Sequence, residues 1–352
     1  AMCPATRPYQ DYLVDYVSNF IHSNGLKALY IDQVGAHRPD RCFAPEHGHP
    51  LGSGSYWMDG YRSMLSRIRQ ACPGVAFTTE NTEEIYMDTL DGFLTWGGSY
   101  TEDVPALAAV YSGYTAWFAT GSEAKDGLDA FAACQSRGFL WGTQLGWLGT
   151  WIFEKPEKFG DRLEHLARLA RLRLAAKKFL VYGELLGEGA PLEEPPLLTT
   201  AHHYKSAAAG QPHDVTLPAV LSTLWKASDG ALGLAVANLS GEARSFGFRL
   251  EPYRHLARAP GKPLLIKRLG ADGETALRTW DGERLELREV LGPYEARVLE
   301  LAPLAGKEPD AGKALGSLAF HEGLRRVGLS LEGEASLGML VAGEPVRPAL
   351  TL

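Results

Sequence analysis

The ten residues LKALYIDQVG, 26–35, contain a strand-like run that ends on a charge. Five of the first six positions suit a buried strand, and the run then ends on the carboxylate of Asp32 and the amide of Gln33. A second such run, VAFTTEN at 75–81, ends on Glu80. In βα-barrel enzymes the strands are buried along their length, and their C-terminal ends open onto the active-site face. Asp32 and Glu80 are therefore predicted to lie at the floor of one pocket.

Helical and strand-like segments alternate over the first half of the chain. Apolar spacing predicts helices at 9–24, from Trp57 to the Pro73–Gly74 break, at 127–138 and at 157–182. Strands are predicted at 26–32, 75–81, 92–96, 106–114 and 139–147. Such alternation is typical of parallel βα units. The loop between the first strand and the second helix is too long for a plain connector, which indicates a functional role.

The pattern changes after Gly187, where a Pro/Gly/Glu-rich linker begins. Short strands separated by turns follow at 219–230, 232–241, 243–250, 263–270 and 296–301. This spacing is typical of an all-β sandwich. The predicted domains are thus 1–187 (α/β), 188–304 (β-sandwich) and 305–352 (an additional β segment). His202 and His203 are expected on the ordinary surface of the sandwich.

The charge and the cysteines exclude some function classes. A net charge of -7 argues against a nucleic-acid or anionic-membrane surface, which would require a basic face. No apolar run is long enough for a membrane span, and residues 1–10 do not resemble a signal peptide. The four cysteines are too few and too scattered for a disulfide framework, so reduced thiols and a soluble, cytoplasmic protein are expected. Cys3 and Cys42, both in Pro-containing loops, are the first pair to examine.

Two carboxylates that project from separate strand ends into one cleft can divide acid and base roles. Burial and mutual repulsion push their pKa values apart. Glycoside hydrolysis uses such a pair, one as nucleophile or base and the other as proton donor to the leaving oxygen. Asp32 is assigned as the nucleophile and Glu80 as the acid/base.

The aromatic and amide residues near predicted strand ends support a sugar ligand. Flat rings there could stack on a pyranose, and amides or loop histidines could bind hydroxyl groups. The predicted substrate-binding residues are Gln33, His47, His49, Trp57, Asn81, Trp96, Tyr111, Trp141 and Gln144.

Four residues of the long loop suggest zinc, namely His37, Cys42, His47 and His49. Their spacing matches no standard structural site, and the HGH sequence at 47–49 places the two histidine side chains awkwardly for one tetrahedral ion. Histidines that bind the backbone or a substrate hydroxyl are favoured, so neither a metal nor another cofactor is predicted.

Six motifs in order carry a resemblance to a known family: MCPAT (2–6), YIDQVGA (30–36), HGHPLGSGSYW (47–57), TTEN (78–81), DGFLTW (91–96) and VYSGY (110–114). Residues 2 to 190 resemble a bacterial family of glycoside hydrolase-like TIM-barrel proteins known only as a domain of unknown function. That family is distantly similar to α-galactosidases and endo-α-N-acetylgalactosaminidases. The resemblance implies an α-linked glycoside, a nucleophilic Asp ending the fourth barrel strand and an acid/base carboxylate on the sixth. Asp32 and Glu80 take these places if 26–32 is the fourth strand.

The same resemblance implies a fold that this chain only partly supplies. Such proteins begin with strands one to three, whereas about five strands precede the predicted sandwich here. The expected fold is therefore the C-terminal part of a (β/α)8-type barrel that lacks its first strands, followed by an all-β sandwich. A missing N-terminal half or a homo-oligomer partner is expected to complete the barrel.

Other interpretations stay open for each of these residues. Asp32 could cap the following loop, and Glu80 could open a helix whose acidic first turn complements the dipole. Asp88 and Asp91 compete for the acid/base role, although a capping or solvated position is favoured for both. The alternative functions are a metal-assisted hydrolase that uses the His/Cys loop and a non-catalytic carbohydrate-binding fragment.

Overall fold

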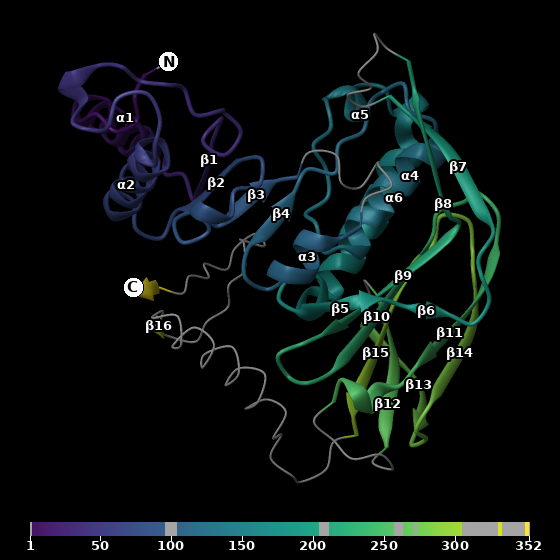
Figure 1. The fold of residues 1–352 in the computed structure, drawn as a ribbon. Helices are drawn as coiled ribbons and strands as arrows, with labels where there is room; N and C mark the ends of the chain where they lie inside the picture. The colour runs from purple at the N-terminus through teal and green to yellow at the C-terminus, as the bar shows by residue number, and fades with distance from the viewer. Residues whose placement is uncertain are drawn as a thin grey trace. The chain divides into compact units, whose positions relative to one another are not determined.

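The structure is a computed structural model that describes residues 2–95, 104–203, 211–256, 263–270 and 273–304, with two short strands, β16 (Ser330–Glu332) and β17 (Ala349–Thr351). The described residues up to 95 form one compact unit, and those from 104 onward form a second (Figure 1). Among the described helices, none has the length and apolar character required to cross a bilayer.

The first unit is built from βα elements. Its members are α1 (Arg7–Asn24), β1 (Ala28–Ile31), the short 3-10 helix η1 (Pro45–His47), α2 (Tyr56–Ala71), β2 (Ala76–Glu80), η2 (Glu84–Tyr86) and β3 (Gly92–Leu94). Strand β1 pairs in parallel with β2, and β2 pairs in parallel with β3. The predicted helix–strand alternation is confirmed for this part of the chain. Three parallel strands do not make a closed barrel, so the complete barrel stays a prediction.

The core of the first unit lies between its helices and its sheet. Helix α2 buries Met64, Leu65 and Ile68, each no more than 2% exposed, and Phe77 and Phe93 are equally buried on the strands. Apolar residues at the i, i+3, i+4 spacing of a helix form one buried stripe, as the sequence predicts. On α1 the buried residues are Gln10, Val14, Val17 and Ile21.

The second unit opens with helices and continues in antiparallel sheets. The helical part contains α3 (Ala106–Tyr111), β4 (Ala116–Phe118), α4 (Leu128–Leu140), α5 (Trp151–Glu154), α6 (Pro156–Ala175) and α7 (Lys177–Leu180). The strands are β5 (Glu184–Glu188), β6 (Ala190–Pro191), β7 (Leu197–His202), β8 (His213–Pro218), β9 (Val220–Lys226), β10 (Leu232–Asn238), β11 (Arg244–Leu250), β12 (Leu264–Gly270), β13 (Gly273–Trp280), β14 (Leu285–Leu291) and β15 (Ala296–Pro303).

Two of these sheets share one core. The six-stranded sheet runs in the order β13-β12-β15-β10-β9-β5, and the three-stranded sheet in the order β14-β11-β6. Their facing side chains, among them Leu234, Phe248, Ile266 and Leu287, form one buried cluster. Helix α4 contacts β9 and β10, and α6 contacts β12, so helices cover the outer face of the larger sheet. An antiparallel β region after residue 187 is thus present, as the sequence predicts.

Three sequence predictions are wrong in the second unit. Residues 106–114, expected as a strand, contain the helix α3 instead. The strand expected at 139–147 is the end of α4 followed by a turn, with one isolated bridge between Gln144 and Phe118. His202, expected on the surface, is only 2% exposed and lies within hydrogen-bond distance of Thr200 Oγ1, 2.8 Å from its Nε2.

Candidate functional site

The register of β1 and β2 brings Asp32 and Glu80 to neighbouring positions. Ile31 of β1 is paired with Thr79 of β2, and the residue that follows each of them carries a carboxylate, Asp32 and Glu80. The Thr79 hydroxyl donates a hydrogen bond to the Ile31 carbonyl at 2.7 Å, which joins the two strand ends. Carboxyl ends of parallel strands lie at one edge of a sheet, so both acids belong to the same edge. Asp32 is exposed, whereas Glu80 is 9% exposed.

The residue after each carboxylate has a left-handed backbone. Gln33 has a backbone φ of 66° and Asn81 one of 63°. Residues other than glycine, asparagine and aspartate seldom adopt this left-handed region. Non-glycine residues held in this region tend to occur at functional sites, where the surrounding structure supports the strain. The turn after Asp32 also directs the Gln33 amide to Glu80, to which it donates a hydrogen bond at 2.5 Å. Gln33, predicted to bind substrate, therefore orients the second carboxylate.

Gly35 allows the loop after β1 to pass directly over the end of β2. Its backbone N–H donates to Thr79 Oγ1 at 3.4 Å. A Cβ at this position would lie 2.7 Å from the Glu80 carbonyl oxygen, and this backbone atom cannot rotate away. The close approach of this loop to the backbone of Glu80 thus depends on a residue without a side chain.

We expect Gly35→Ala to destabilise the first unit by about 1–3 kcal/mol, because the added methyl group overlaps backbone. The same shift should displace Glu80 and lower any turnover. Urea unfolding and kcat/KM measure the two effects. Gly160→Ala is the matched control, since nothing lies within 4 Å of that position in α6, and it should leave turnover unchanged. Equal stability of the Gly35 variant and the parent protein would contradict this packing.

Tyr30 is a site residue that the sequence analysis missed. It lies two positions before Asp32, and alternate strand residues share a face. Its hydroxyl donates to Asp32 Oδ1 at 3.1 Å. Burial raises the pKa of Tyr30, and the hydrogen bond to Asp32 and the charges of Asp32 and Glu80 raise it further. The charges of both carboxylates therefore act on the Tyr30 hydroxyl, which stays protonated and can donate a hydrogen bond at neutral pH.

The competing carboxylates have structural partners. Asp88 pairs with Arg62 of α2. Asp91 pairs with Arg69 at 2.9 Å and accepts the backbone N–H of Phe77 at 2.7 Å. The sequence favours a capping or solvated position for both, and the structure instead pairs each aspartate with an arginine of α2.

The correspondence with barrel strands four and six is wrong. Strands β1 and β2 are hydrogen-bonded neighbours, with no strand between them. If β1 is the fourth barrel strand, then Glu80 ends the fifth strand. The assignment of Glu80 as acid/base therefore rests on its place beside Asp32 and not on the family pattern.

The other residues predicted to bind substrate lie in different parts of the structure. Trp57 is 4% exposed, with His37 stacked on it at 5.6 Å between ring centroids and Tyr61 against it edge-on at 5.5 Å, so its ring is largely core. Tyr111 and Trp141 belong to the second unit, where the Arg137 guanidinium lies 4.5 Å from the Trp141 ring. Gln144, also there, is exposed. Asn81 follows Glu80 and is exposed. Trp96 lies outside the described residues.

His47 and His49 lie beside two cysteines. His47 Nδ1 is 3.2 Å from Cys42 Sγ, and His49 Nε2 is 3.3 Å from Cys3 Sγ. All four cysteines of the chain are free thiols. Cys3 is the member of this group that the zinc interpretation of the loop did not include, because the N-terminal segment is distant in sequence.

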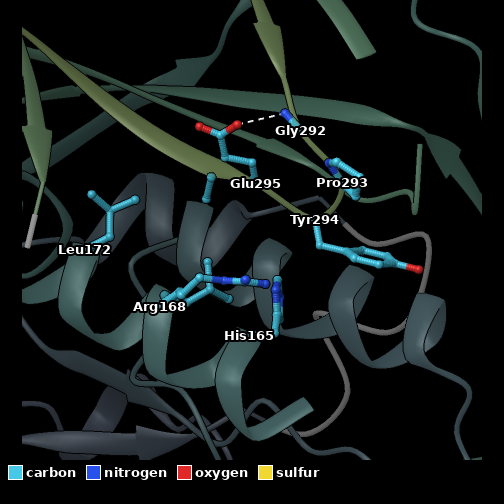
Figure 2. Close-up of a pocket in the computed structure, with 9 residues that line it drawn as sticks. His165, Arg168, Leu172, Gly292, Pro293, Tyr294 and Glu295 are labelled. Atoms are coloured by element: carbon cyan, nitrogen blue, oxygen red, sulfur yellow. Dashed lines mark hydrogen bonds between the residues drawn. The ribbon is translucent and has the colours of Figure 1, made fainter. Parts of the chain in front are cut away.

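A separate cavity of about 240 Å³ lies in the second unit, between α6 and the turn before β15. Figure 2 shows His165 and Arg168 on the helix facing Pro293 and Tyr294 of the turn. The Glu295 carboxylate accepts the Gly292 N–H at 2.7 Å, which closes the turn. A larger hollow of about 610 Å³ lies along β6, β9 and β11.

The N-terminal third of the chain matches a known family. Residues 1–121 match the model of a family described as Domain of unknown function (DUF6259). A Bacteroides thetaiotaomicron protein named "Putative glycoside hydrolase" is 30% identical over 207 residues, covering 55% of this chain and 30% of that protein. A Monosiga brevicollis protein named "Putative glycoside hydrolase 22789" is 24% identical over 298 residues, covering 75% of this chain and 24% of that protein. The chain spans less than a third of the length of these curated relatives. The resemblance to a glycoside hydrolase-like family is confirmed.

Two solved structures illustrate the structural similarity. The alpha-amylase of Geobacillus thermoleovorans, complexed with acarbose, has a TM-score of 0.49 at 11% identity, covering 86% of this chain and 65% of that one. The alpha-galactosidase I of Mortierella vinacea has a TM-score of 0.47 at 6% identity, covering 82% of this chain and 71% of that one. Neither similarity is close enough to place a residue or a substrate.

Proposed function

We propose that the β1–β2 edge is the catalytic centre of a retaining glycosidase, with Asp32 as the nucleophile and Glu80 as the acid/base. The observation that carries this proposal is the register, because the two carboxylates follow directly paired residues of adjacent parallel strands. Adjacent strands lie about 4.8 Å apart. Retaining enzymes need carboxyl groups about 5–5.5 Å apart, whereas inverting enzymes need a wider gap for water.

The local contacts suit this division of roles. Asp32 is the exposed member, so it can reach the anomeric carbon and form the glycosyl–enzyme bond. Glu80 is the buried member, and its carboxyl group is oriented by the Gln33 amide. In the first step Glu80 gives its proton to the leaving oxygen; in the second it takes a proton from the attacking water. The Tyr30 hydroxyl, which donates a hydrogen bond to Asp32, keeps this side chain in position between the two steps.

The substrate proposed for this centre is an α-linked glycoside. The names of the two curated relatives support a glycoside as the substrate, and the α linkage rests on the resemblance to α-galactosidases alone. The exposed side chain of Asn81, next to Glu80, is the candidate for a sugar hydroxyl.

A panel of aryl α- and β-glycosides tests the proposal on this chain. We expect phenol release from an α-glycoside, with the first sugar product in the α configuration by proton NMR. A first product of β configuration would exclude retention. Binding of the sugar at the β1–β2 edge without turnover of any glycoside would instead support the carbohydrate-binding alternative.

A further inference from the structure

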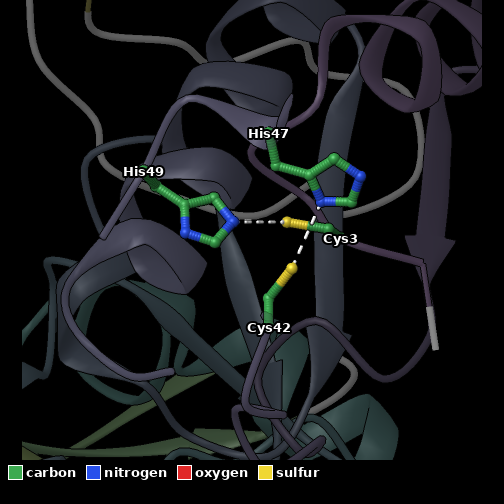
Figure 3. Close-up of side chains that lie close together, drawn as sticks. All are labelled: Cys3, Cys42, His47 and His49. Carbon is green, nitrogen blue, oxygen red and sulfur yellow. Dashed lines mark hydrogen bonds between the residues drawn. The ribbon is translucent and has the colours of Figure 1, made fainter. Parts of the chain in front are cut away.

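Four metal-binding side chains meet at one point in the first unit. The ligand atoms of Cys3, Cys42, His47 and His49 all lie within 4.8 Å of one another. Figure 3 shows the two thiols between the two imidazoles, with His49 directed at Cys3 and His47 at Cys42. The two sulfur–nitrogen distances are 3.3 and 3.2 Å. In a tetrahedral zinc site with Zn–S of about 2.3 Å and Zn–N of about 2.0–2.1 Å, these edges would be about 3.6 Å.

We propose that Cys3, Cys42, His47 and His49 bind one structural zinc ion. Two thiolates and two imidazoles are a standard donor set for tetrahedral zinc. Four protein ligands fill that geometry and leave no position for water or substrate. The site is therefore structural, and this argues against metal-assisted hydrolysis by the His/Cys loop.

The loop itself is folded to present three of the ligands. Cys42 and Gly52 form an isolated antiparallel bridge, with Cys42 N–H donating to the Gly52 carbonyl at 3.0 Å. Inside this closed loop, η1 ends at His47, and Gly48 turns the chain with φ 75°. The left-handed glycine lets His47 and His49 face the same point, which the sequence spacing alone makes improbable.

His49 is held in the form that a metal requires. Its Nδ1 lies 2.8 Å from the Pro50 carbonyl, so the ring proton resides there and the Nε2 lone pair faces Cys3. Metal-binding histidines commonly donate their other ring N–H to such an oxygen. The ring also stacks on Tyr56 at 4.0 Å between centroids, with the two planes 8° apart, which fixes its direction.

Cys3 is held in position by the close packing of the N-terminal segment against Gly60 of α2. A Cβ on Gly60 would lie 2.5 Å from the Pro4 carbonyl carbon, so the N-terminal segment rests directly on α2. The buried Gln10 amide donates to the Pro4 carbonyl at 2.9 Å and to the Gly60 carbonyl at 3.2 Å. These contacts hold the segment without the metal's help, and the Cys3 thiol points at the loop. Zinc would then join the N-terminal segment to the loop that begins just after Asp32.

Metal analysis of the full chain, purified under reducing conditions, tests the proposal. We expect one zinc per chain, and after exchange with cobalt the visible bands of a tetrahedral site with thiolate charge transfer. Removal of zinc by a chelator should lower the melting temperature by ~5 °C or more. Cys3→Ser and His47→Gln should lose stoichiometric zinc. Two matched controls should keep it: His37→Gln, in the same loop but outside the cluster, and Cys72→Ala.

Three results would overturn the proposal, and the first two are measured on the parent protein, so they do not depend on any variant being stable. The first is folded, reduced parent protein that binds neither zinc nor cobalt at stoichiometric level. The second is a Cys3–Cys42 disulfide in protein prepared without oxygen. The third is one tightly bound zinc that survives the double replacement of Cys3 and Cys42. Because the readouts are metal content, a spectrum, a melting temperature and the redox state of two cysteines, the result is independent of the proposed glycosidase activity.

Discussion

Asp32→Asn should lower kcat/KM for an aryl α-glycoside by at least ~10³, because the amide cannot form the glycosyl–enzyme bond. Folding should be unaffected, since Asp32 is exposed and its hydrogen bond from Tyr30 can be made to the amide oxygen. Initial rates and circular dichroism check the two expectations. Asp15→Asn is the matched control, because Asp15 is an exposed acid on α1. Full activity of the Asp32 variant would remove Asp32 from the mechanism.

Glu80→Gln should give a different pattern that identifies the acid/base. Loss of a general acid costs about 10²–10⁴ when the leaving group is poor. An activated nitrophenyl substrate needs little protonation, so its first step should survive while deglycosylation slows. Added azide should then restore turnover and give a glycosyl azide of retained configuration. Equal losses for good and poor leaving groups, without azide rescue, would assign Glu80 a structural role.

A further large effect is expected on the stability of the protein in acid. Burial lowers the pKa of both His165 and His202 to about 4, and each side chain is no more than 2% exposed. An unfolded histidine titrates near 6.5. Both groups therefore stabilise the fold fully above pH 6.5, and that contribution is lost as pH falls toward 4. Each shift corresponds to about 3 kcal/mol.

Urea unfolding of the second unit between pH 7 and 4 measures this loss. The free energy of unfolding should fall with a slope approaching two protons per molecule. His202→Gln should flatten the curve, provided that the amide keeps the contact with Thr200. His22→Gln, at an exposed position on α1, should leave it unchanged. A stability independent of pH across this range would mean that both histidines have the same pKa in the folded and the unfolded protein.

Periodicity predicted the first unit well. Helices α1 and α2 show the 3.6-residue pattern, and the strands β1 and β2 are short apolar runs bounded by glycine or proline. The two wrongly predicted strands in the second unit, at 106–114 and 139–147, have a common cause. An apolar run such as 106–114 is equally compatible with a buried helix and a strand. Helix α4 is buried over nearly its whole length, so its last residues lack the polar face that marks a helix.

Strand β13 was missed for the opposite reason. Seven of its eight residues are exposed, and its sequence GETALRTW lacks a regular apolar face. Its place is set by pairing with β12, which no local pattern reveals.

The candidate site was predicted only where chemistry and strand ends coincide. Asp32 and Glu80 could be found because a charge at the end of an apolar run is unusual. Tyr30 could have been found by counting back two residues from Asp32. The meeting of Cys3 with the loop depends on contacts at Gly60 and Gln10, which involve residues far apart in the sequence.

The left-handed turns at Gln33 and Asn81 have a consequence for anyone who engineers this protein. In saturation libraries at the two positions, most variants will be lost because they destabilise the turn, whatever their effect on ligand binding. The reason is that branched side chains are poorly tolerated at φ near 65°. Glycine, asparagine and aspartate are the replacements most compatible with the loop. Altered specificity is therefore better sought at neighbouring positions whose backbone is relaxed.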